Sequence, residues 1–461
     1  MKIVIKNLGA LKQAEFSLGD MTIICGRNNT GKTYATYALF GFLTYWRECL
    51  PINVSERMID QLLTDGTVQV DITEYSKNAP SILDSGCVAY AKRLPVIFAA
   101  PAERFKESQF IVTVNADDAH PSHKYERRMR APNAELFSII KAEASNELLV
   151  TLLVENAKTR IPRDIIKRTI CEALKDIVFG HLFPTPFIAS AERTGAAIFR
   201  KDLNFARNRL LEEMTHTDKD VNPLELLFKV YQDYALPVKI NVDFTRQLEA
   251  LAKKKSFVAI QYPEVLNDFV DIIGGEYTVT RNDELYYVPK GKHIKLTMDE
   301  SSSAVRSLLD IGFYLRHMAK PGDLLIVDEP ELNLHPENQR RVARLFARLV
   351  NIGVKVFITT HSDYIIKELN TLIMLSHDKP HLKRIAQEEG YKPEELISSD
   401  RIRVYIAEEA LIRLEGGQRR TRCQTLRPAD IDPERGVEAS SFDVTIETMN
   451  RIQEEIVWGM E

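Results

Sequence analysis

The sequence predicts an α/β fold organised around a parallel β-sheet, and a stretch late in the chain carries most of this prediction. Residues 324–327 read LLIV, and four consecutive apolar residues are typical of a strand buried on both faces of a parallel sheet. Pro336 and Glu337 mark the start of a helix, because proline and an acidic residue both favour the first helical turn. Gly353 ends that helix, and the apolar run VKVFITT at 354–360 predicts a second buried strand. Strand, helix and strand in this order indicate two parallel strands joined by a helical crossover.

Polar side chains stand where both predicted strands end. Asp328 and Glu329 follow the first strand, and His361 follows the second. Open α/β sheets bind their ligands in a crevice outside the carboxyl ends of the strands. An ordinary strand–helix–strand unit explains the apolar residues but not two carboxylates and a histidine. We therefore expect a ligand site here, in which the carboxylates hold a cation and a nucleotide phosphate completes the site.

A phosphate-binding motif lies near the other end of the chain. Residues 26–33 read GRNNTGKT, which matches GxxxxGK[ST] in full. The motif follows the apolar run MTIIC at 21–25 and precedes a helical stretch, which is the context that the motif requires. Backbone N–H groups of such a loop cradle phosphates, so the sequence predicts nucleotide binding. The residues expected to contact the nucleotide are Gly26, Asn28, Asn29, Thr30, Gly31, Lys32 and Thr33.

These motifs, in this order, resemble those of the ABC-type ATPase heads of the SMC, RecF and OLD kind. Residues 1–33 look like the β-rich N-terminal lobe of such heads running into the Walker A motif. DESSSAVRSLLDIGFYLRH at 299–317 lies where their signature helix lies, and LLIVDEPELNLHP at 324–336 looks like Walker B with the D-loop. ITTHSDYII at 358–366 looks like their switch-histidine loop. Within this group, the chain most resembles the stand-alone AAA-family ATPases of bacterial anti-phage systems, such as PtuA of Septu and the ATPase of PARIS.

The resemblance implies an ABC-type P-loop ATPase head, with a mixed N-terminal β lobe, a parallel-sheet RecA-like core and helical insertions. It implies ATP and Mg²⁺ as cofactors, with Lys32 on the β/γ-phosphates and Thr33 and Asp328 on the metal ion. Glu329 is expected to polarise the attacking water, and His361 to contact the γ-phosphate. Because the serines of one head close the site of another, the resemblance also implies a homodimer or a higher homo-oligomer.

Two positions depart from the pattern of the resembled heads. The LSGGQ signature is absent, and three serines at 301–303 stand in its place, of which Ser302 and Ser303 are the expected phosphate contacts. No glutamine stands at the position of the Q-loop, where Glu192 and Arg193 follow the apolar run FPTPFIAS. Glu192 and Arg193 either come near the nucleotide or form a surface salt bridge.

The motifs divide the chain into six predicted parts. These are the N-terminal part of the head with Walker A over 1–40, an insertion over 41–182, a return to the core over 183–199, a helical subdomain over 200–275, the hairpin, signature helix, Walker B and switch-histidine loop over 276–375, and a C-terminal lobe over 376–461 that could dock a partner. The insertion is expected to be largely helical, with helical runs at 134–158 and 163–182 and a strand-like run at 93–105. Alternating apolar residues near the N-terminus predict half-exposed strands, with Ile3, Ile5, Phe16 and Leu18 facing inward.

The composition excludes several classes of protein. A formal net charge of −4 gives no global basic excess, so any nucleic-acid surface must be a local patch. Five scattered cysteines without a CxxC pair argue against a zinc site or a disulfide framework and fit a reducing cytoplasm. With no signal peptide and no apolar run of membrane-spanning length, we expect a cytoplasmic protein without a membrane partner.

Three outputs of the expected ATPase compete. The favoured one is a scaffold or sensor that controls a separate effector, a nuclease or toxin from a neighbouring gene, in anti-phage defence. The alternative is a RecF- or SMC-like DNA-binding ATPase in DNA repair or recombination, and a transporter motor is disfavoured because LSGGQ is absent. A basic run over 419–427 and a stripe of Ile446, Met449, Ile452 and Ile456 either belong to a docking surface or are a solvated face and a packed helix. If the run docks a partner, charge reversal at Arg419, Arg420 and Arg422 is expected to leave ATP hydrolysis intact.

Overall fold

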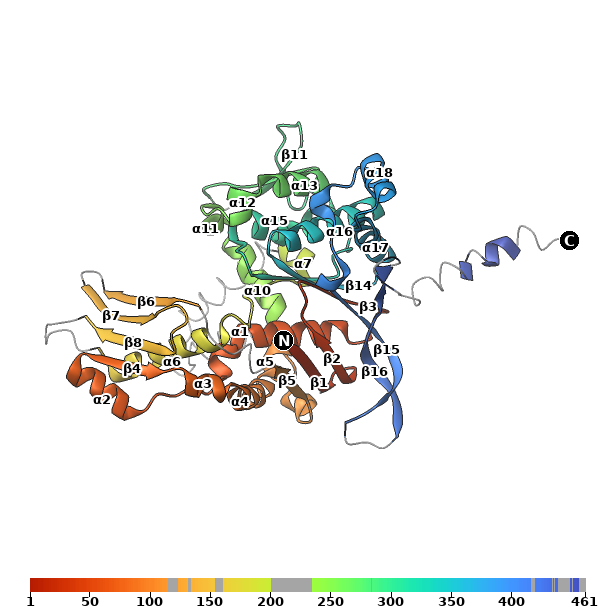
Figure 1. Ribbon diagram of the computed structural model, residues 1–461. Coiled ribbons are helices and arrows are strands. Elements are labelled where there is room, and N and C mark those ends of the chain that lie inside the picture. The colour runs from red at the N-terminus through yellow and green to blue at the C-terminus, as the bar shows by residue number, and fades with distance from the viewer. Residues whose placement is uncertain are drawn as a thin grey trace, which may run out of the picture. The chain divides into compact units, whose positions relative to one another are not determined.

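The computed structural model describes residues 1–114, 123–131, 134–153, 161–199, 234–282, 284–415, 419–432, 434, 436–437, 448–449 and 451–455 (Figure 1). The chain divides into two compact units. The first unit comprises Met1–Val4, Phe42–Arg93 and Ser108–Pro184, and the second comprises Ile5–Gly41, Leu94–Glu107 and Thr185–Glu461. The division falls within strand β1 (Lys2–Leu8) and helix α1 (Lys32–Cys49).

The second unit is built on a six-stranded sheet with the strand order β16-β15-β3-β14-β13-β9. The strands are β3 (Met21–Gly26), β9 (Pro186–Ala189), β13 (Leu324–Asp328), β14 (Lys355–Thr360), β15 (Ile402–Arg413) and β16 (Arg420–Pro428). Each neighbouring pair from β9 to β15 is parallel, and β16 joins β15 in antiparallel fashion. The parallel sheet predicted from the apolar runs is therefore confirmed, and the carboxyl ends of five strands lie along one edge.

The apolar strands of this sheet are buried on both faces, as the runs LLIV and VKVFITT predict. One face packs against α16 (Pro336–Asn351) and α17 (Asp363–Leu375), whose buried residues belong to the same hydrophobic core. On the other face, Phe16 of β2 (Leu11–Ser17) lies against Phe357, with ring centroids 6.1 Å apart. Burial of each large apolar side chain stabilises the fold by about 1.5–3 kcal/mol. The sheet is thus a rigid platform for the groups at its edge.

The N-terminal strands alternate between buried and exposed residues, as expected. Ile3, Ile5 and Phe16 are buried, whereas Leu18 lies just beyond β2 and is partly buried. β16 packs along β2, where the Thr425 hydroxyl donates a hydrogen bond to the Gln13 carbonyl at 2.6 Å. The C-terminal hairpin therefore belongs to the same unit as the N-terminal strands.

Short helices and a hairpin lie between β9 and β13. They are α7 (Arg193–Ile198), α10 (Leu236–Arg246), α11 (Leu248–Ala252), α12 (Phe257–Gln261), α13 (Pro263–Ile273), β10 (Gly275–Val279), β11 (Leu285–Pro289) and β12 (Leu296–Thr297). β10 and β11 pair antiparallel, which confirms the predicted hairpin. The part of the predicted helical subdomain over 200–233 lies outside the described residues.

The expected signature helix is divided into three short pieces. These are α14 (Ser303–Ser307), α15 (Leu309–Phe313) and η3 (Tyr314–Met318), the last being a turn of π-helix. The segment is thus helical at the expected position, with breaks in its regularity at Leu308 and Tyr314. The expected N-terminal serine cap is nevertheless present, because the Ser302 hydroxyl accepts the Val305 N–H at 3.3 Å.

The first unit contains several helices, as expected for the insertion, together with a β-sheet that the sequence patterns did not predict. A four-stranded sheet with the order β4-β8-β7-β6 contains β4 (Thr67–Asp71), β6 (Tyr125–Ala131), β7 (Ala134–Lys141) and β8 (Glu147–Leu152). The helical run predicted over 134–158 is wrong, because the described part of it forms β7 and β8. In β8, the buried Leu148 and Val150 alternate with exposed residues, which is the period of a strand rather than of a helix.

Helices accompany this sheet in the first unit. They are α2 (Glu56–Asp65), α3 (Thr73–Lys77), α4 (Ala79–Ala91) and α6 (Arg163–Phe179), and a further strand, β5, spans Gln109–Thr113. α6 confirms the second predicted helical run.

The strand-like run at 93–105 forms α5 (Leu94–Phe98) and a 3₁₀ turn, η1 (Ala102–Phe105), so that prediction is wrong as well. Ala99 with a φ of 48° and Pro101 interrupt any strand there.

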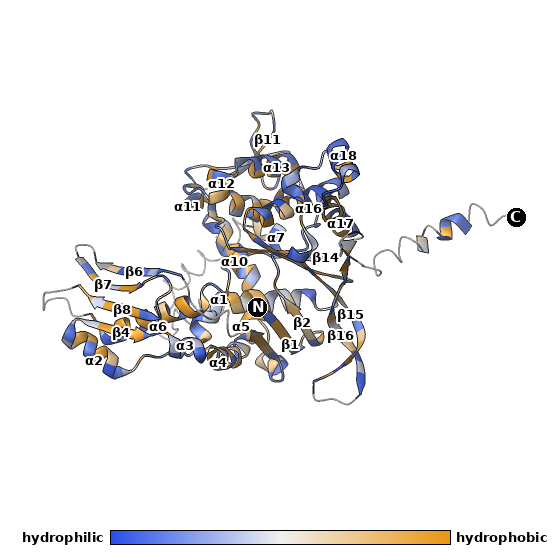
Figure 2. Cartoon of the chain, in the orientation of Figure 1, coloured by the Kyte–Doolittle hydropathy of each residue, from blue (hydrophilic) through white to orange (hydrophobic). Residues whose placement is uncertain are grey.

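The outer elements of the second unit follow β14. They are α18 (Pro380–Glu388), the 3₁₀ turns η4 (Pro393–Glu395) and η5 (Ser399–Arg401), and the short strands β17 (Ile431–Asp432) and β18 (Gly436–Val437). α18 buries no residue, and Figure 2 shows its hydrophilic colouring. In the predicted C-terminal stripe, Met449 and Ile452 are exposed, and Ile446 and Ile456 lie outside the described residues. No helix in the described ranges is long and apolar enough to cross a membrane.

Candidate functional site

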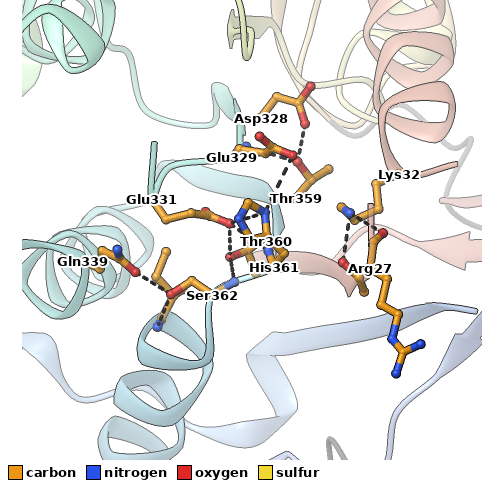
Figure 3. Close-up of polar contacts among 12 residues, drawn as sticks. Arg27, Lys32, Asp328, Glu329, Glu331, Gln339, Thr359, Thr360, His361 and Ser362 are labelled. Atoms are coloured by element: carbon orange, nitrogen blue, oxygen red, sulfur yellow. Dashed lines mark hydrogen bonds and ion pairs between the residues drawn. The ribbon is translucent and has the colours of Figure 1, made fainter. Parts of the chain in front are cut away.

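The ends of β3, β13 and β14 bring the residues predicted for the two motifs to one edge of the sheet (Figure 3). The register pairs Asp328 with Thr359, and Thr360 with Cys25, the residue before Gly26. Lys32 is the first residue of α1, directly after the loop that leaves β3. The sheet therefore places a lysine, two carboxylates and a histidine at neighbouring strand ends.

The loop between β3 and α1 has a backbone that few residues could adopt. Gly26, Asn29 and Gly31 have φ angles of 145°, 63° and 98°, in the left-handed half of the map where glycine and asparagine are favoured. A Cβ atom at Gly26 would lie 2.4 Å from the carbonyl oxygen of Ala407, and one at Gly31 would lie 2.7 Å from the Leu11 side chain. Two glycines of the motif are thus required by the fold itself. The loop leads into the N-terminus of an eighteen-residue helix, where backbone N–H groups favour an anion.

The Lys32 ammonium group holds this loop from inside. Its Nζ donates hydrogen bonds to the carbonyl oxygens of Gly26 at 2.9 Å and Arg27 at 2.8 Å, and the residue is only 5% exposed. Burial lowers the pKa of Lys32, whereas the nearby Glu329 and Asp328 oppose that shift. The Arg27 guanidinium points away from these carboxylates in Figure 3. Of the two cationic side chains in the motif, Lys32 is therefore the one that lies near the carboxylates.

Asp328 offers an unsatisfied buried carboxylate oxygen. The residue is 1% exposed; its Oδ1 accepts the Thr359 hydroxyl, and its Oδ2 has no hydrogen-bond partner among the described residues. Burial raises the pKa of Asp328 to about 6, and the neighbouring Glu329 and Glu192 act in the same direction. A buried carboxylate oxygen without a donor is costly, and a cation would satisfy it. The unsatisfied carboxylate oxygen of Asp328 is therefore a suitable ligand for a metal ion.

The surroundings of Asp328 favour one type of ion. In the described part of the chain, no group of three or more His, Cys, Asp or Glu residues could hold a metal by itself. Mg²⁺ is commonly held by one or two protein oxygens together with substrate phosphates and water. The Thr33 side chain, one residue beyond Lys32, is exposed. These features fit Mg²⁺ that binds together with a nucleotide.

Glu329 has a left-handed backbone that is rare for residues other than glycine. Its φ is 51°, and such conformations outside glycine concentrate at functional sites. Its N–H donates to the carbonyl and the hydroxyl of Thr359 at 3.1 and 3.2 Å. Its side chain remains 25% exposed, so solvent reaches the carboxylate. The residue thus combines a fixed backbone with an accessible acid.

His361 is oriented by a carboxylate that the sequence reasoning missed. Glu331 is buried, and its Oε1 accepts the His361 N–H at 2.7 Å and the Thr360 hydroxyl at 2.9 Å. The same Oε1 lies 3.1 Å from Nδ1 of His361, whereas Oε1 of Glu329 lies 3.7 Å from it. Burial raises the pKa of Glu331. A histidine that donates from Nδ1 keeps Nε2 for another partner. The sequence carried one signal for this role, a third acidic residue two positions after Glu329.

The loop that carries His361 is fixed by further polar contacts. The Ser362 hydroxyl donates to Oε1 of Gln339 at 2.5 Å and accepts the Ile365 N–H at 3.3 Å, which caps α17. Gln339 lies on α16, the helix between β13 and β14. The two strand ends are therefore tied together beside the histidine (Figure 3).

Glu192 and Arg193 do not form a surface salt bridge, so that alternative is wrong. Arg193 is 1% exposed and donates four hydrogen bonds to backbone carbonyl oxygens, two of them those of Asp328 and Glu329. Glu192 accepts the Tyr37 hydroxyl at 2.9 Å. Burial, together with the charge of Glu192, raises the pKa of Tyr37 far above its usual range. Both residues therefore border the site.

The serine segment presents one exposed hydroxyl. Ser302 is exposed at the start of α14, Ser303 is partly buried, and Ser301 is buried with its hydroxyl on the Thr297 carbonyl at 2.7 Å. The guanidinium of Arg306 bonds back to the carbonyls of Met298 and Ser301. Contact of Ser302 and Ser303 with a nucleotide stays a prediction.

A cavity of about 600 Å³ adjoins the loop and extends to the C-terminal hairpin. Gly26, Arg27, Thr30 and His361 line one part of it, and Glu409 and Arg422 line another. Arg422 pairs with Glu409 at 3.1 Å, and Arg427 pairs with Glu408 at 2.6 Å. Arg422 of the basic run therefore lines the same cavity as Gly26 and Arg27, and its role as part of a docking surface or a solvated face stays a prediction.

Comparison with known proteins identifies the family of the chain. Residues 1–366 match the family model described as AAA ATPase domain. Among solved structures, the chain is similar to an SMC head bound to the C-winged helix domain of ScpA, with 12% identity over 92% of this chain and 97% of that one and a TM-score of 0.33. It is also similar to the SMC head domain from Thermotoga maritima, with 11% identity over 93% and 98% of the two chains and a TM-score of 0.30. A search of curated proteins found no match. Because the family model spans most of the 461 residues, the chain belongs to the AAA ATPase domain family and is an ATP-hydrolysing enzyme.

Proposed function

We propose that this ATPase binds Mg²⁺-ATP at the ends of β3, β13 and β14 and hydrolyses it within a homodimer or higher homo-oligomer. The observation that carries the proposal is the meeting of three groups at one sheet edge. These groups are the Lys32 ammonium, the unsatisfied Oδ2 of Asp328 and the accessible carboxylate of Glu329. A cation site and a phosphate site that share an edge are the parts that phosphoryl transfer requires.

Each residue has a role that follows from its surroundings. Lys32 would exchange its bonds to the loop carbonyls for phosphate oxygens, because a phosphate is a stronger acceptor for an ammonium group. Asp328 and Thr33 would hold Mg²⁺, which supplies positive charge to the phosphate oxygens. Glu329 would orient the attacking water and accept its proton. His361, fixed through Nδ1 by Glu331, would offer Nε2 to the γ-phosphate.

The site is completed, in this proposal, by a second copy of the chain. Ser302 is exposed at the start of α14, and its hydroxyl, which accepts the Val305 N–H, would donate a hydrogen bond to a phosphate held by a partner. The resemblance to ABC-type heads supports the assignment of Ser302 and Ser303 to the γ-phosphate bound by the other copy. Occupancy of the site would then couple ATP to assembly.

We assign the output of the ATPase to anti-phage defence, where it would hold or release a separate nuclease or toxin. The resemblance to stand-alone ATPases of such systems supports this assignment. A neighbouring reading frame that encodes a small nuclease or toxin, and loss of protection from phage when Lys32 is replaced, are the expected results. ATP-dependent retention of duplex DNA by the purified chain, with no effect on phage plating, would favour DNA repair instead.

Glu329→Gln tests the proposed chemistry. The amide keeps the shape of the side chain but cannot accept a proton, so we expect ATP binding to persist while single-turnover hydrolysis slows by about 10²- to 10⁴-fold. The variant should accumulate an ATP-dependent larger species in light scattering. Unchanged hydrolysis would remove Glu329 from catalysis, and a constant mass with and without ATP would remove support for the ATP-bound dimer.

A further inference from the structure

The buried guanidinium group of Arg193 joins three segments of the second unit. Its Nε donates to the Ser307 carbonyl at 2.7 Å, and its Nη1 donates to the carbonyls of Ser190 at 2.8 Å and Asp328 at 2.6 Å. Its Nη2 donates to the Glu329 carbonyl at 2.9 Å. These acceptors lie after β9, at the end of α14, and at the end of β13. One side chain therefore ties the serine segment to the strand end that carries Asp328 and Glu329.

The charge of Arg193 is compensated in an unusual way. Burial lowers its pKa, and the largest opposing influence is Asp310 in α15. Asp310 is itself buried, and neither of its carboxylate oxygens has a hydrogen-bond partner among the described residues. A buried charge that is not hydrogen-bonded to its counter-charge is costly, and apolar residues would pack there more cheaply. Such an arrangement is better explained by a role in function than by stability.

Arg348 shows what a structural arginine looks like in the same unit. It is also buried, on α16, but it forms ion pairs with Asp268 and Glu264. Its guanidinium therefore stabilises the packing of α16 on α13 through carboxylates. Arg193 instead donates its hydrogen bonds to backbone carbonyl groups at the site. The contrast provides a matched control.

Arg193 fixes the backbone of Glu329 from one side. The Glu329 N–H is held by Thr359, and the Glu329 carbonyl is held by Arg193, so both peptide groups of this left-handed residue are fixed. A displacement of the Ser307 carbonyl would move the guanidinium, and the guanidinium would in turn move the Glu329 carbonyl. Ser307 ends the helix whose first turn is capped by Ser302.

We propose that Arg193 is a positioning residue that transmits contact at Ser302 and Ser303 to the catalytic carboxylate of Glu329, with the buried Asp310 carboxyl group as the acid that most favours its charge. This inference rests on the proposed function, because it assumes that Glu329 acts on water. When a partner engages the start of α14, the guanidinium sets the Glu329 backbone for hydrolysis. Without that contact, hydrolysis is slow. Arg193 thus makes the hydrolytic step depend on assembly.

Arg193→Lys tests the coupling, because lysine keeps the charge but cannot reach three segments at once. We expect kcat to fall about 10- to 100-fold, as small displacements of a catalytic group cost this much, with less than about a threefold change in the Kd for Mg²⁺-ATP. The loss of kcat should be accompanied by a weaker dependence of turnover on protein concentration. Arg193→Lys and Arg348→Lys should lower the melting temperature by similar amounts. Arg348→Lys, however, should leave kcat unchanged. An Arg193→Lys variant that loses only stability would overturn the proposal.

A double variant separates a positioning role from a general one. In the Glu329→Gln background, Arg193→Lys should reduce the residual kcat by less than about threefold, because the group that it positions is already disabled. Multiplicative losses would show that Arg193 acts elsewhere and would overturn the inference. If Arg193→Lys does not fold, Asp310→Asn takes its place, with an expected fall in kcat and the same non-additivity. If Glu329→Gln itself hydrolyses ATP normally, the proposed function fails. If Glu329→Gln is impaired but the Arg193 and Asp310 variants behave like wild type, the proposed function stands and this inference fails.

Discussion

Two buried lysines, one in each unit, make the same hydrogen bonds in different surroundings. Lys32 in the second unit donates to the carbonyls of Gly26 and Arg27, and Lys141 at the end of β7 in the first unit donates to those of His123 and Ala142. Burial lowers the pKa of both. Glu329, Asp328 and Glu331 oppose this shift at Lys32, whereas Glu143 alone among the described residues opposes it at Lys141. Local bonding therefore does not distinguish a functional lysine from a structural one.

The carboxylates around Lys32 make the difference. Asp328 and Glu331 each keep a buried oxygen without a hydrogen-bond partner among the described residues, so the strand ends are incomplete without a ligand. In the first unit, by contrast, Arg127 and Glu172 form an ion pair at 3.1 Å. A region that leaves buried polar groups unsatisfied stores free energy that a bound cation and phosphate would recover.

The largest expected effect comes from replacing the two lysines by alanine. Lys32→Ala removes the only motif cation aimed at the phosphates, so ATP hydrolysis should fall by about 100-fold or more. Lys141→Ala should leave hydrolysis within about twofold of wild type. It should destabilise the chain by about 1 kcal/mol, because two part-buried hydrogen bonds to the His123 and Ala142 carbonyls are lost. Steady-state phosphate release and denaturant unfolding of both variants measure the contrast, and near-normal turnover of Lys32→Ala would end the P-loop assignment.

A smaller effect is expected at Glu331, which acts through His361. Glu331→Gln can still accept the hydrogen bonds of the Thr360 hydroxyl and the His361 N–H, but it no longer carries the negative charge that lies 3.1 Å from Nδ1 of His361. We expect hydrolysis to fall about 10- to 100-fold, as for other groups that orient a functional histidine. Glu172→Gln, in an ion pair of the first unit, is the matched control and should not change hydrolysis. Equal activities of the two variants would show that His361 needs no orientation from Glu331.

The same contrast explains what could be predicted from the sequence. The strands β3, β13 and β14 follow from continuous apolar runs. The loop residues follow from a motif in which a side chain at either glycine would collide with Ala407 or Leu11. Glu331 was not predicted, because the role of a third acid depends on a hydrogen bond to His361 across two strands. Arg193 was left between two interpretations, since only the fold reveals that its acceptors come from three distant segments.

The first unit was predicted poorly for a physical reason. Residues 134–152 contain enough leucine, isoleucine and glutamate to favour a helix, yet strand pairing decides their conformation. Each of β7 and β8 is half-buried and finds its partner across a short turn, so tertiary context overrides intrinsic propensity. No binding motif anchors the register there. The unit that lacks a motif is thus the one where sequence patterns mislead.

Arg422 allows a test of whether the C-terminal hairpin belongs to the site. Arg422→Glu breaks the pair with Glu409 and places a negative charge in the cavity that adjoins Gly26 and Arg27. We expect the affinity for ATP to fall about three- to tenfold, by roughly the cost of one or two like-charge contacts near the surface. Arg419→Glu, next to the same strand but outside the cavity lining, should change the affinity by less than twofold. If both variants bind fluorescent ATP like wild type, the basic run is not part of the nucleotide site.

The smallest expected effect is a change in the pH dependence of stability at Asp310. Burial raises the pKa of Asp310 from 3.8 to about 7 in the folded chain, because the cost of burying the charge outweighs the attraction of Arg193. The folded state therefore binds the Asp310 proton more tightly than the unfolded state does. This proton binding stabilises the folded state at low pH, and the stabilisation is lost as the pH rises from about 4 through 7. Asp310→Asn carries no such proton, so the melting temperature of the variant should gain on that of wild type as the pH increases from 5 to 8. Thermal unfolding of both proteins across this range measures the difference. Parallel curves would mean that Asp310 is already ionised in the folded chain at pH 5, and that Arg193 is held by a true ion pair.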